Sequence, residues 1–367
     1  MSEAANLLGR AKLALDTPAL LVDLDVLEVN IARIAETCRV NGVSWRPHMK
    51  GHKTAEIARM EIAAGAVGVT CAKLGEAEAM ADCGIRNILI ANQIVGPLKV
   101  RRLIDLTARA EPIVAVDSLP HLVELGAAAQ ASGKVLPVVI EVNIGMNRAG
   151  VEPGAPVVAL ADAIVAQGGL RFGGLMGWES QAVTIADPAE KARVVAEAIG
   201  RLSESARLCR DAGHAVEIVS CGGTGTFPFC AQQPGVTELQ VGGAIFSDMH
   251  YRTHYHSDFS CALTVLATVT SRPTPTRVVL DAGRKAMPGD HAMPQPIGLP
   301  AIAAMRLSAE HAKVEFERPS DEPRIGERVE FIVGYSDTTV HLHEEIVALR
   351  KGRVEAIWRV VARGRIK

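Results

Sequence analysis

Aromatic residues are scarce in this sequence, since Phe, Tyr and Trp together make up 4% of the 367 residues. The charges also nearly cancel, because 39 Lys and Arg stand against 41 Asp and Glu, which leaves a net charge of -2. Nucleic-acid-binding proteins usually carry clustered positive charge, and many stack aromatic rings on bases. The composition therefore disfavours a nucleic-acid-binding protein.

Long apolar runs are missing too, so no membrane span is expected. The N-terminal sequence MSEAANLLGRAKLALDTP has an early glutamate and no long apolar core, which argues against a secretory signal. The 7 cysteines are odd in number and show no C-x-x-C spacing. We therefore expect a cytoplasmic protein whose thiols are reduced.

Short β-branched runs alternate with alanine-rich stretches of helical periodicity. The expected strands cover 42–47, 66–72, 87–92, 112–117, 136–143, 171–177, 215–220 and 236–242. The clearest expected helices are Thr54–Ala64, Leu74–Asp82, Leu119–Ala131 and Pro188–Ala212, the last with Asp187 as its N-cap. Such alternation predicts parallel strands joined by right-handed crossovers. Eight of them predict an α/β fold, a (β/α)8 TIM-type barrel over residues 25–248; an open doubly wound sheet is the alternative.

The pattern changes after about residue 245. Short alternating segments separated by Pro, Gly and charged turns predict an antiparallel β domain formed by 249–367 together with 1–24. The strand-like stretch 16–25 could belong to either unit, and TVHLHEEIVAL (339–349) is expected to be a strand. The histidine-rich MHYRTHYH (249–256) is expected to be a linker packed between the domains, with a metal site as the alternative.

Reactive groups of such barrels lie on the loops that follow the strands. The loop CGGTGT (221–226) follows the seventh strand, where barrels often bind phosphate. Its glycines let backbone N–H groups surround an anion, and Thr224 and Thr226 add hydroxyl donors. A tight turn that needs glycine is the alternative interpretation. The dinucleotide-binding spacing G-x-G-x-x-G is absent.

The stretch WRPHMKGHK (45–53) ends the first expected barrel strand. Lys50 could form a Schiff base with an aldehyde if burial and the nearby cations Arg46, His52 and Lys53 promote loss of its proton. Taken alone, the stretch could be a solvated basic loop. A lysine and a phosphate-binding loop on the same rim instead favour a phosphorylated aldehyde cofactor held by its tail.

Several segments, in this order, resemble the D-threonine aldolase and D-serine dehydratase family: DTPALLVDLDVLEVNI, RPHMKGHK, EVNIGMNRAGV, CGGTGT, TELQVGGAIFSD, VLDAG and YSDTTVHLH. These are pyridoxal-phosphate enzymes of the alanine-racemase fold type. The resemblance spans nearly the whole chain. It implies a barrel plus a β domain, a homodimer and a small amino-acid substrate. The composition and the missing apolar runs already imply no nucleic-acid or membrane partner.

The resemblance also implies roles for single residues. Lys50 matches the lysine that holds pyridoxal 5'-phosphate as an internal aldimine, and Arg148 matches the arginine facing the pyridine nitrogen. Trp178 stands where the family usually has a tyrosine beside the cofactor. The other expected cofactor-binding residues are His48, Gly222, Gly223, Thr224, Gly225, Thr226, Gln240, Gly242 and Gly243.

The family binds a divalent metal (Mn, Mg or Zn) through a C-terminal His-x-Asp or His-x-Cys pair. This sequence has Tyr335 and Asp337 at the matching positions, so Asp337 is the remaining candidate ligand. His341 or His343 could substitute, but on a strand these two share one face while Asp337 lies four residues back. Tyr335 is a candidate catalytic acid or base, with a simply packed phenol as the alternative.

The resemblance implies a lyase acting on β-hydroxy-D-amino acids, most directly by retro-aldol cleavage to glycine and an aldehyde. Dehydration of D-serine or 3-hydroxy-D-aspartate is the alternative, and racemisation, favoured by Tyr335, is a third. Glu179 is the ionisable group of the loop GWESQAVT, which leaves the base for the β-hydroxyl open. A pyridoxal-phosphate carrier is disfavoured, because such carriers are usually a single barrel.

Overall fold

The computed structural model describes residues 6–367, and its internal contacts divide the chain into two compact units. The barrel unit contains 31–50, 55–242 and 364–367. The sheet unit contains the described residues up to Asn30, together with 51–54 and 243–363. Helix α1 (Leu24–Val40) contains the division at Asn30. The domain boundaries expected from the sequence stay a prediction.

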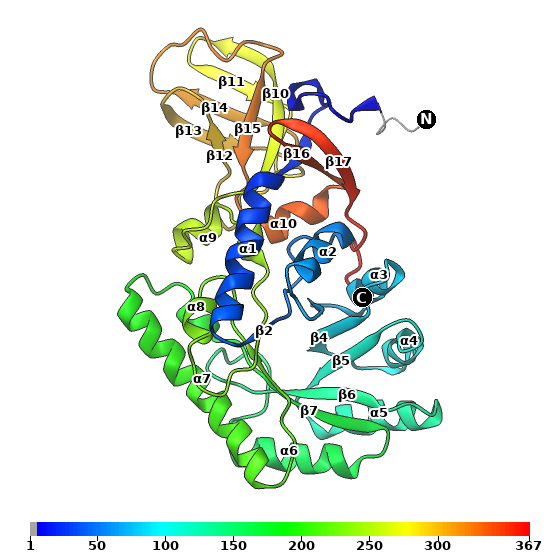
Figure 1. Cartoon of the computed structure of the whole chain (residues 1–367). Coiled ribbons are helices and arrows are strands. Elements are labelled where there is room, and N and C mark those ends of the chain that lie inside the picture. Colours follow the sequence, from blue (N-terminus) through cyan, green and yellow to red (C-terminus); the bar gives the residue numbers. More distant parts are fainter. Residues whose placement is uncertain (1–5) are drawn as a thin grey trace. The chain divides into compact units, whose positions relative to one another are not determined.

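Within residues 6–367, the barrel unit holds an 8-stranded sheet in the order β2-β9-β8-β7-β6-β5-β4-β3. Figure 1 labels its neighbouring strands β4, β5, β6 and β7. All its pairings are parallel, as predicted. The strands are β2 (Ser44–Trp45), β3 (Val69–Cys71), β4 (Asn87–Gln93), β5 (Glu111–Val116), β6 (Leu136–Glu141), β7 (Leu170–Met176), β8 (Ile218–Cys221) and β9 (Glu238–Leu239).

The two ends of this sheet meet. A parallel bridge joins His48, just after β2, to Thr70 of β3, and the Met49 N–H donates to the Thr70 carbonyl over 2.9 Å. The strands therefore form a closed barrel, and the open doubly wound sheet is excluded. Buried Leu89, Ala115 and Val139 form part of its core. The predicted TIM-type barrel is confirmed.

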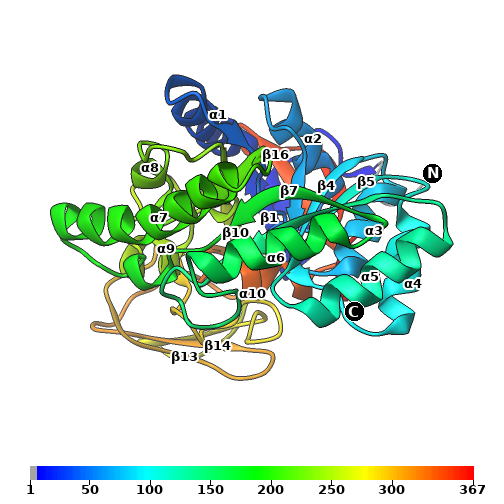
Figure 2. The same ribbon diagram turned by 90° about the horizontal axis from the view of Figure 1, so that it is seen from below.

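Helices connect the barrel strands, and Figure 2 shows α4, α5 and α6 outside the sheet. The predicted helix positions agree closely with the structure, and the Asp187 carboxylate caps α7 by accepting the Glu190 N–H over 2.8 Å. The helices are α2 (Ala55–Ala63), α3 (Leu74–Asp82), α4 (Pro97–Leu106), α5 (Leu119–Ala131), α6 (Ala155–Ala166), α7 (Pro188–Asp211), α8 (Phe227–Cys230) and the short 3-10 helix η3 (Ser180–Ala182).

The sheet unit contains, among the described residues, a 9-stranded sheet with the path β13-β14-β11-β10-β1-β16-β17; β15 pairs with β10 and β12. The strands are β1 (Ala19–Asp23), β10 (Leu263–Thr274), β11 (Arg277–Leu280), β12 (Gln295–Ile297), β13 (Ile302–Leu307), β14 (Ala312–Phe316), β15 (Arg328–Ile332), β16 (Glu345–Arg350) and β17 (Arg353–Arg359). The stretch 16–25 thus gives a strand of this sheet. Its pairing with β16 is parallel, so the sheet is mostly rather than wholly antiparallel.

The strand expected from Thr339 begins only at Glu345 with β16, and one residue explains the two short helices found in this unit. The Asp248 carboxylate accepts the N–H groups of Tyr251 and Ser336, each over 2.8 Å. These bonds start helix α9 (Met249–His254), where a linker was expected, and helix α10 (Ser336–Thr339), where a strand was expected to begin at Thr339. The cap lies 88 residues from Ser336 in sequence, so local β-branched composition gave no sign of it. The remaining 3-10 helices are η2 (Lys12–Ala14), η4 (Gly243–Ile245) and η5 (Val340–Leu342).

No helix of the described residues is both long enough and apolar enough to cross a membrane.

Candidate active site

Lys50 lies in the turn that joins β2 to α2, at the carboxyl end of the barrel strands. Its side chain is half-buried, and its backbone N–H donates to Nδ1 of His48 over 3.4 Å. The His48 N–H donates in turn to the Gln240 carbonyl over 3.1 Å, which ties the turn to the end of β9. A Cβ on Gly242 would lie 2.2 Å from the His48 carbonyl oxygen, so only glycine allows this approach.

The neighbouring cations have other structural roles than those expected. Arg46 is buried and donates to the Glu238 carboxylate over 2.8 Å and to the Asn87 amide oxygen over 2.5 Å. These partners are the first residues of strands β9 and β4. The Arg46 charge is therefore paired at the amino ends of the strands, whereas Lys50 lies at their carboxyl ends. His52 accepts the Thr54 N–H at Nδ1 over 3.2 Å.

Lys53 lies just before helix α2, which begins at Ala55, one residue after the expected start. Lys53 has a φ of 52°, which is left-handed backbone, and its carbonyl accepts the Ala362 N–H over 3.1 Å.

The glycine-rich loop lies between β8 and α8, also at the carboxyl end of a barrel strand. Gly222 has a φ of 81°, a conformation that favours glycine. A Cβ on Gly223 would lie 2.9 Å from Nε1 of Trp178. Within residues 6–367, the N–H groups of Thr224 and Gly225 have no protein acceptor. These two donors and the Thr224 hydroxyl fit a bound phosphate group.

Glu179 lies behind this loop and is 0% exposed. Its carboxylate accepts the Thr226 hydroxyl over 2.5 Å and the Gly222 N–H over 3.3 Å. The sequence left it open whether Glu179 serves as a base; the structure shows a buried group that positions the loop. Sequence reasoning gave no sign of this burial.

Two cysteines complete this buried cluster. Cys221, Cys230 and Glu179 offer ligand atoms within 4.8 Å of one another, an arrangement that could hold a metal ion. Burial, together with hydrogen bonding to Cys221 and Glu179, raises the pKa of the Cys230 thiol well above its usual range. Protonated thiols that bond their neighbours are poor metal ligands. We therefore interpret the cluster as a hydrogen-bonded support for the loop.

Trp178 and Arg148 lie together beside the loop. The Arg148 guanidinium is 5.7 Å from the centroid of the Trp178 ring, within the range of a cation–π contact. Arg148 follows β6, and its guanidinium lies 3.8 Å from the Glu141 carboxylate. Two predicted cofactor-binding side chains are thus brought into contact.

A group of polar residues that the sequence analysis missed supports Arg148. Glu141 ends β6, and burial raises the pKa of its carboxyl group. Gln93, at the end of β4, donates to the carboxylates of Glu141 over 2.6 Å and Asp117 over 3.2 Å. Asp117 also accepts the Gly150 N–H over 3.1 Å, which fixes the loop carrying Arg148. Their positions could have identified these residues in the sequence, since each of them ends or directly follows a barrel strand.

The sheet unit contains the remaining predicted residues. The Tyr335 hydroxyl donates to Oδ2 of Asp337 over 3.0 Å. Its ring lies 4.8 Å from those of both His250 and His291, between centroids. A Cβ on Gly51, the residue after Lys50, would lie 2.8 Å from Oδ1 of Asp337.

The division between the two units falls directly after Gly242, so Gly243 belongs to the sheet unit. A Cβ there would lie 2.2 Å from the Tyr251 hydroxyl. Gln240, by contrast, belongs to the barrel unit, where its amide donates to the Ser220 hydroxyl over 3.0 Å.

The residues at 335 and 337 do not fit a divalent-metal site. Burial and the nearby Asp337 charge raise the pKa of Tyr335 far above its usual range, so the phenol keeps its proton. A neutral phenol is a poor ligand, and its proton already bonds an oxygen of Asp337. The histidines considered as substitutes do not lie on a strand: His341 is in η5, and His343 is hydrogen-bonded through Nε2 to the Ala286 carbonyl over 2.7 Å.

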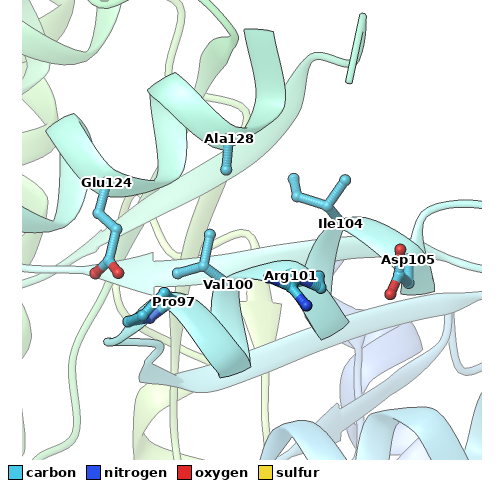
Figure 3. Close-up of a pocket in the computed structure, with 7 residues that line it drawn as sticks. All are labelled: Pro97, Val100, Arg101, Ile104, Asp105, Glu124 and Ala128. Atoms are coloured by element: carbon cyan, nitrogen blue, oxygen red, sulfur yellow. The ribbon is translucent and has the colours of Figure 1, made fainter. Parts of the chain in front are cut away.

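A surface groove lies between helices α4 and α5. Figure 3 shows Val100 and Ile104 pointing toward Ala128 across it. Its lining contains no predicted site residue and consists of Pro97, Val100, Arg101, Ile104, Asp105, Glu124 and Ala128. The candidate active site is therefore not in this groove.

Two family models match the chain. The alanine racemase N-terminal domain matches residues 22–250, and a putative serine dehydratase domain matches residues 262–349. The chain belongs to the alanine racemase N-terminal domain family. Its second match agrees with the resemblance seen in the sequence, which combined this fold type with serine dehydratases.

Relatives in this family cover nearly the whole chain. D-threonine aldolase of Arthrobacter sp is 35% identical over 352 residues, covering 95% of this chain and 93% of the relative. 3-hydroxy-D-aspartate aldolase of Paracoccus denitrificans (strain Pd 1222) is 32% identical, covering 97% and 94%. The crystal structure of D-threonine aldolase from Filomicrobium marinum superposes with a TM-score of 0.94 at 38% identity, covering 98% of this chain and 99% of that one.

Proposed function

We propose that this protein is a pyridoxal-phosphate-dependent lyase that cleaves β-hydroxy-D-amino acids into glycine and an aldehyde. The observation that carries the proposal is the carboxyl rim of the barrel, where Lys50 and the Gly222–Thr226 loop follow parallel strands of one closed sheet. The aldolase names of relatives with full-length similarity support the choice of reaction.

When bound, pyridoxal phosphate would supply an aldehyde carbon and a conjugated ring that accepts electrons from the substrate's Cα. Lys50 would hold that carbon covalently and yield it to the substrate amine. The N–H groups of Thr224 and Gly225 would bind the phosphate. Trp178 would pack beside the ring, with His48 next to Lys50.

Arg148 would face the pyridine nitrogen. A guanidinium stays charged at any physiological pH, so it disfavours a proton on that nitrogen. Glu141 lies 3.8 Å from the guanidinium and would hold its orientation. This arrangement would moderate how strongly the ring withdraws electrons from Cα.

Tyr335 is the proposed acid/base residue of the sheet unit. Its raised pKa means that the hydroxyl stays protonated, so it would offer a hydrogen bond and would not act as a base in its resting state. Asp337 would fix the direction of that hydroxyl by accepting its hydrogen bond. The proposed reaction does not depend on a metal, because Tyr335 and Asp337 do not fit a metal site.

The experiment that tests this function is a product analysis of purified protein loaded with pyridoxal phosphate. D-threonine, D-serine and 3-hydroxy-D-aspartate would be offered separately. Glycine together with an aldehyde supports the proposal. An oxo acid with ammonia would identify a dehydratase, the second candidate, which the match to a putative serine dehydratase domain favours. The enantiomer of the substrate would identify a racemase.

The assembly and location of the protein are part of the same proposal. We infer a homodimer, as the sequence resemblance implies, located in the cytoplasm, where its cysteines would stay reduced. Light scattering of the purified protein at micromolar concentration tests the first point, and a single monomer mass would contradict it. Fractionation of producing cells tests the second.

A further inference from the structure

Helix α7 carries a lysine that points into the protein. Lys191 is 5% exposed, and its ammonium donates to the backbone carbonyls of Val183 over 3.2 Å and Gly225 over 3.3 Å. Lysine is rarely buried so completely, because its charged form loses the solvation of water. The same burial lowers the pKa of the Lys191 amine. The reaction proposed above makes no use of this group.

The position of Lys191 relates it to the phosphate-binding loop. Its partner Gly225 lies inside Gly222–Thr226, so the ammonium holds one carbonyl of the loop on the buried side. Glu179, which is also buried, binds the Thr226 hydroxyl and the Gly222 N–H. The loop is thus attached to two buried charged side chains. The N–H groups of Thr224 and Gly225 have no acceptor among residues 6–367.

Charge balance gives Lys191 a function beyond holding the loop. The buried Glu179 carboxylate would repel a phosphate dianion bound to the same loop, and repulsion is strong where burial lowers the dielectric constant. The Lys191 ammonium, which bonds the carbonyl of Gly225 directly before Thr226, would offset that repulsion. Methionine would fill the site with similar volume but would leave the carboxylate unbalanced.

We propose that Lys191 is a phosphate-specificity residue: its ammonium offsets the Glu179 carboxylate behind the Gly222–Thr226 loop, so that the loop selects a phosphate monoester dianion over an unphosphorylated aldehyde. This inference rests on the proposed pyridoxal-phosphate function. Lys191 acts through the loop and does not touch the reacting atoms, so it is a positioning residue.

The test compares the affinities of the full-length apoprotein for pyridoxal phosphate, pyridoxal and inorganic phosphate. Lys191→Met should weaken pyridoxal phosphate and inorganic phosphate binding about tenfold or more and leave pyridoxal within about twofold. Lys134→Met, an exposed site, is the matched control and should change none of them. Adding Glu179→Gln to Lys191→Met should recover most of the lost phosphate affinity, because the unbalanced charge is removed.

Equal weakening of pyridoxal phosphate and pyridoxal would overturn the inference, since it would show a purely structural role. Failure of Glu179→Gln to recover affinity would overturn the charge argument. If Lys191→Met does not fold, Lys191→Gln, which keeps a donor without the charge, replaces it.

A measurement on the unmodified protein serves as a further check. The ³¹P chemical shift of bound pyridoxal phosphate should remain that of the dianion at pH values where the phosphate of the free cofactor is protonated. If the shifts of bound and free cofactor change with pH in the same way, the proposal is contradicted. The wild-type protein could bind inorganic phosphate more tightly than Lys191→Met does and still not bind pyridoxal phosphate. That result would contradict the proposed function and would leave the inference about the loop standing.

Discussion

Lys50 is the residue on which the proposed chemistry depends. Lys50→Ala should abolish the visible absorbance that pyridoxal phosphate acquires when linked to a lysine, and turnover should fall below detection. Lys53→Ala is the matched control, because it removes a lysine three positions away that the proposal gives no role. An unchanged absorption spectrum in Lys50→Ala would show that another amine holds the cofactor.

Tyr335 provides the second residue-level prediction. Tyr335→Phe removes the hydroxyl that donates to Asp337 and keeps the ring packed against His250 and His291. If the hydroxyl acts as an acid, the maximal rate should fall about 100-fold while cofactor affinity stays constant. A rate within about twofold of wild type would leave a packed phenol as the better interpretation.

Single residues were also where the sequence was least informative. Lys50 and the glycine-rich loop could be found because reactive groups of barrels follow strands. The functions of Arg46 and Glu179 could not, since their partners Glu238 and Thr226 are 192 and 47 residues away. A buried ion pair leaves no pattern in the local sequence. The basic residues beside Lys50 were therefore expected to promote loss of the Lys50 proton.

At the level of elements, the loop between β8 and α8 should tolerate little change. A Cβ on Gly223 would lie 2.9 Å from Nε1 of Trp178. Gly223→Ala should therefore displace the indole or the loop and weaken pyridoxal phosphate binding about tenfold, which is 1.4 kcal/mol. Cofactor titration measures this.

Gly200→Ala is the control for Gly223→Ala. Gly200 lies within helix α7, and no atom lies within 4 Å of an added Cβ. This substitution should leave cofactor affinity unchanged and should stabilise the helix slightly. If Gly223→Ala also leaves affinity unchanged, the loop does not hold the phosphate as proposed.

Asp248 controls two short helices of the sheet unit. Burial raises the pKa of its carboxyl group to about 7. Because this pKa is above the unfolded value near 3.8, the folded state binds more protons between pH 4 and 7. The Asp248 contribution to the free energy of unfolding should therefore decline as pH rises through that window and stay low above it.

Asp248→Asn tests whether Asp248 contributes to stability in this pH-dependent way. The amide can accept only one of the two N–H groups of Tyr251 and Ser336, so we expect a loss of about 1–3 kcal/mol at pH 6. The difference between the variant and wild type should shrink toward pH 8. Urea unfolding across this range measures it; a difference independent of pH would contradict the raised pKa.

The barrel elements were predictable and the short helices were not, for a physical reason. Strands such as β6 and β7 are mostly buried apolar runs, and helix α7 has a clear apolar periodicity, so local sequence determines both. Helices α9 and α10 have 6 and 4 residues and depend on Asp248 for their first hydrogen bonds. Tertiary contacts rather than propensity decide such segments.

At the level of the whole molecule, full-length similarity to two aldolases supports the class of enzyme. The sequence alone predicted the family, because its segments occur in one order over the whole chain. It could not predict how Tyr335 and Asp337 pair, since that depends on burial and on rings from α9 and the 291 loop.

The most direct test of the central claim is the quantification of products from D-threonine by the protein loaded with pyridoxal phosphate, with Lys50→Ala alongside. The proposed function predicts one glycine and one acetaldehyde for each D-threonine consumed, and neither product from the variant. Release of ammonia and an oxo acid in place of glycine, or glycine formation that persists in Lys50→Ala, would contradict it.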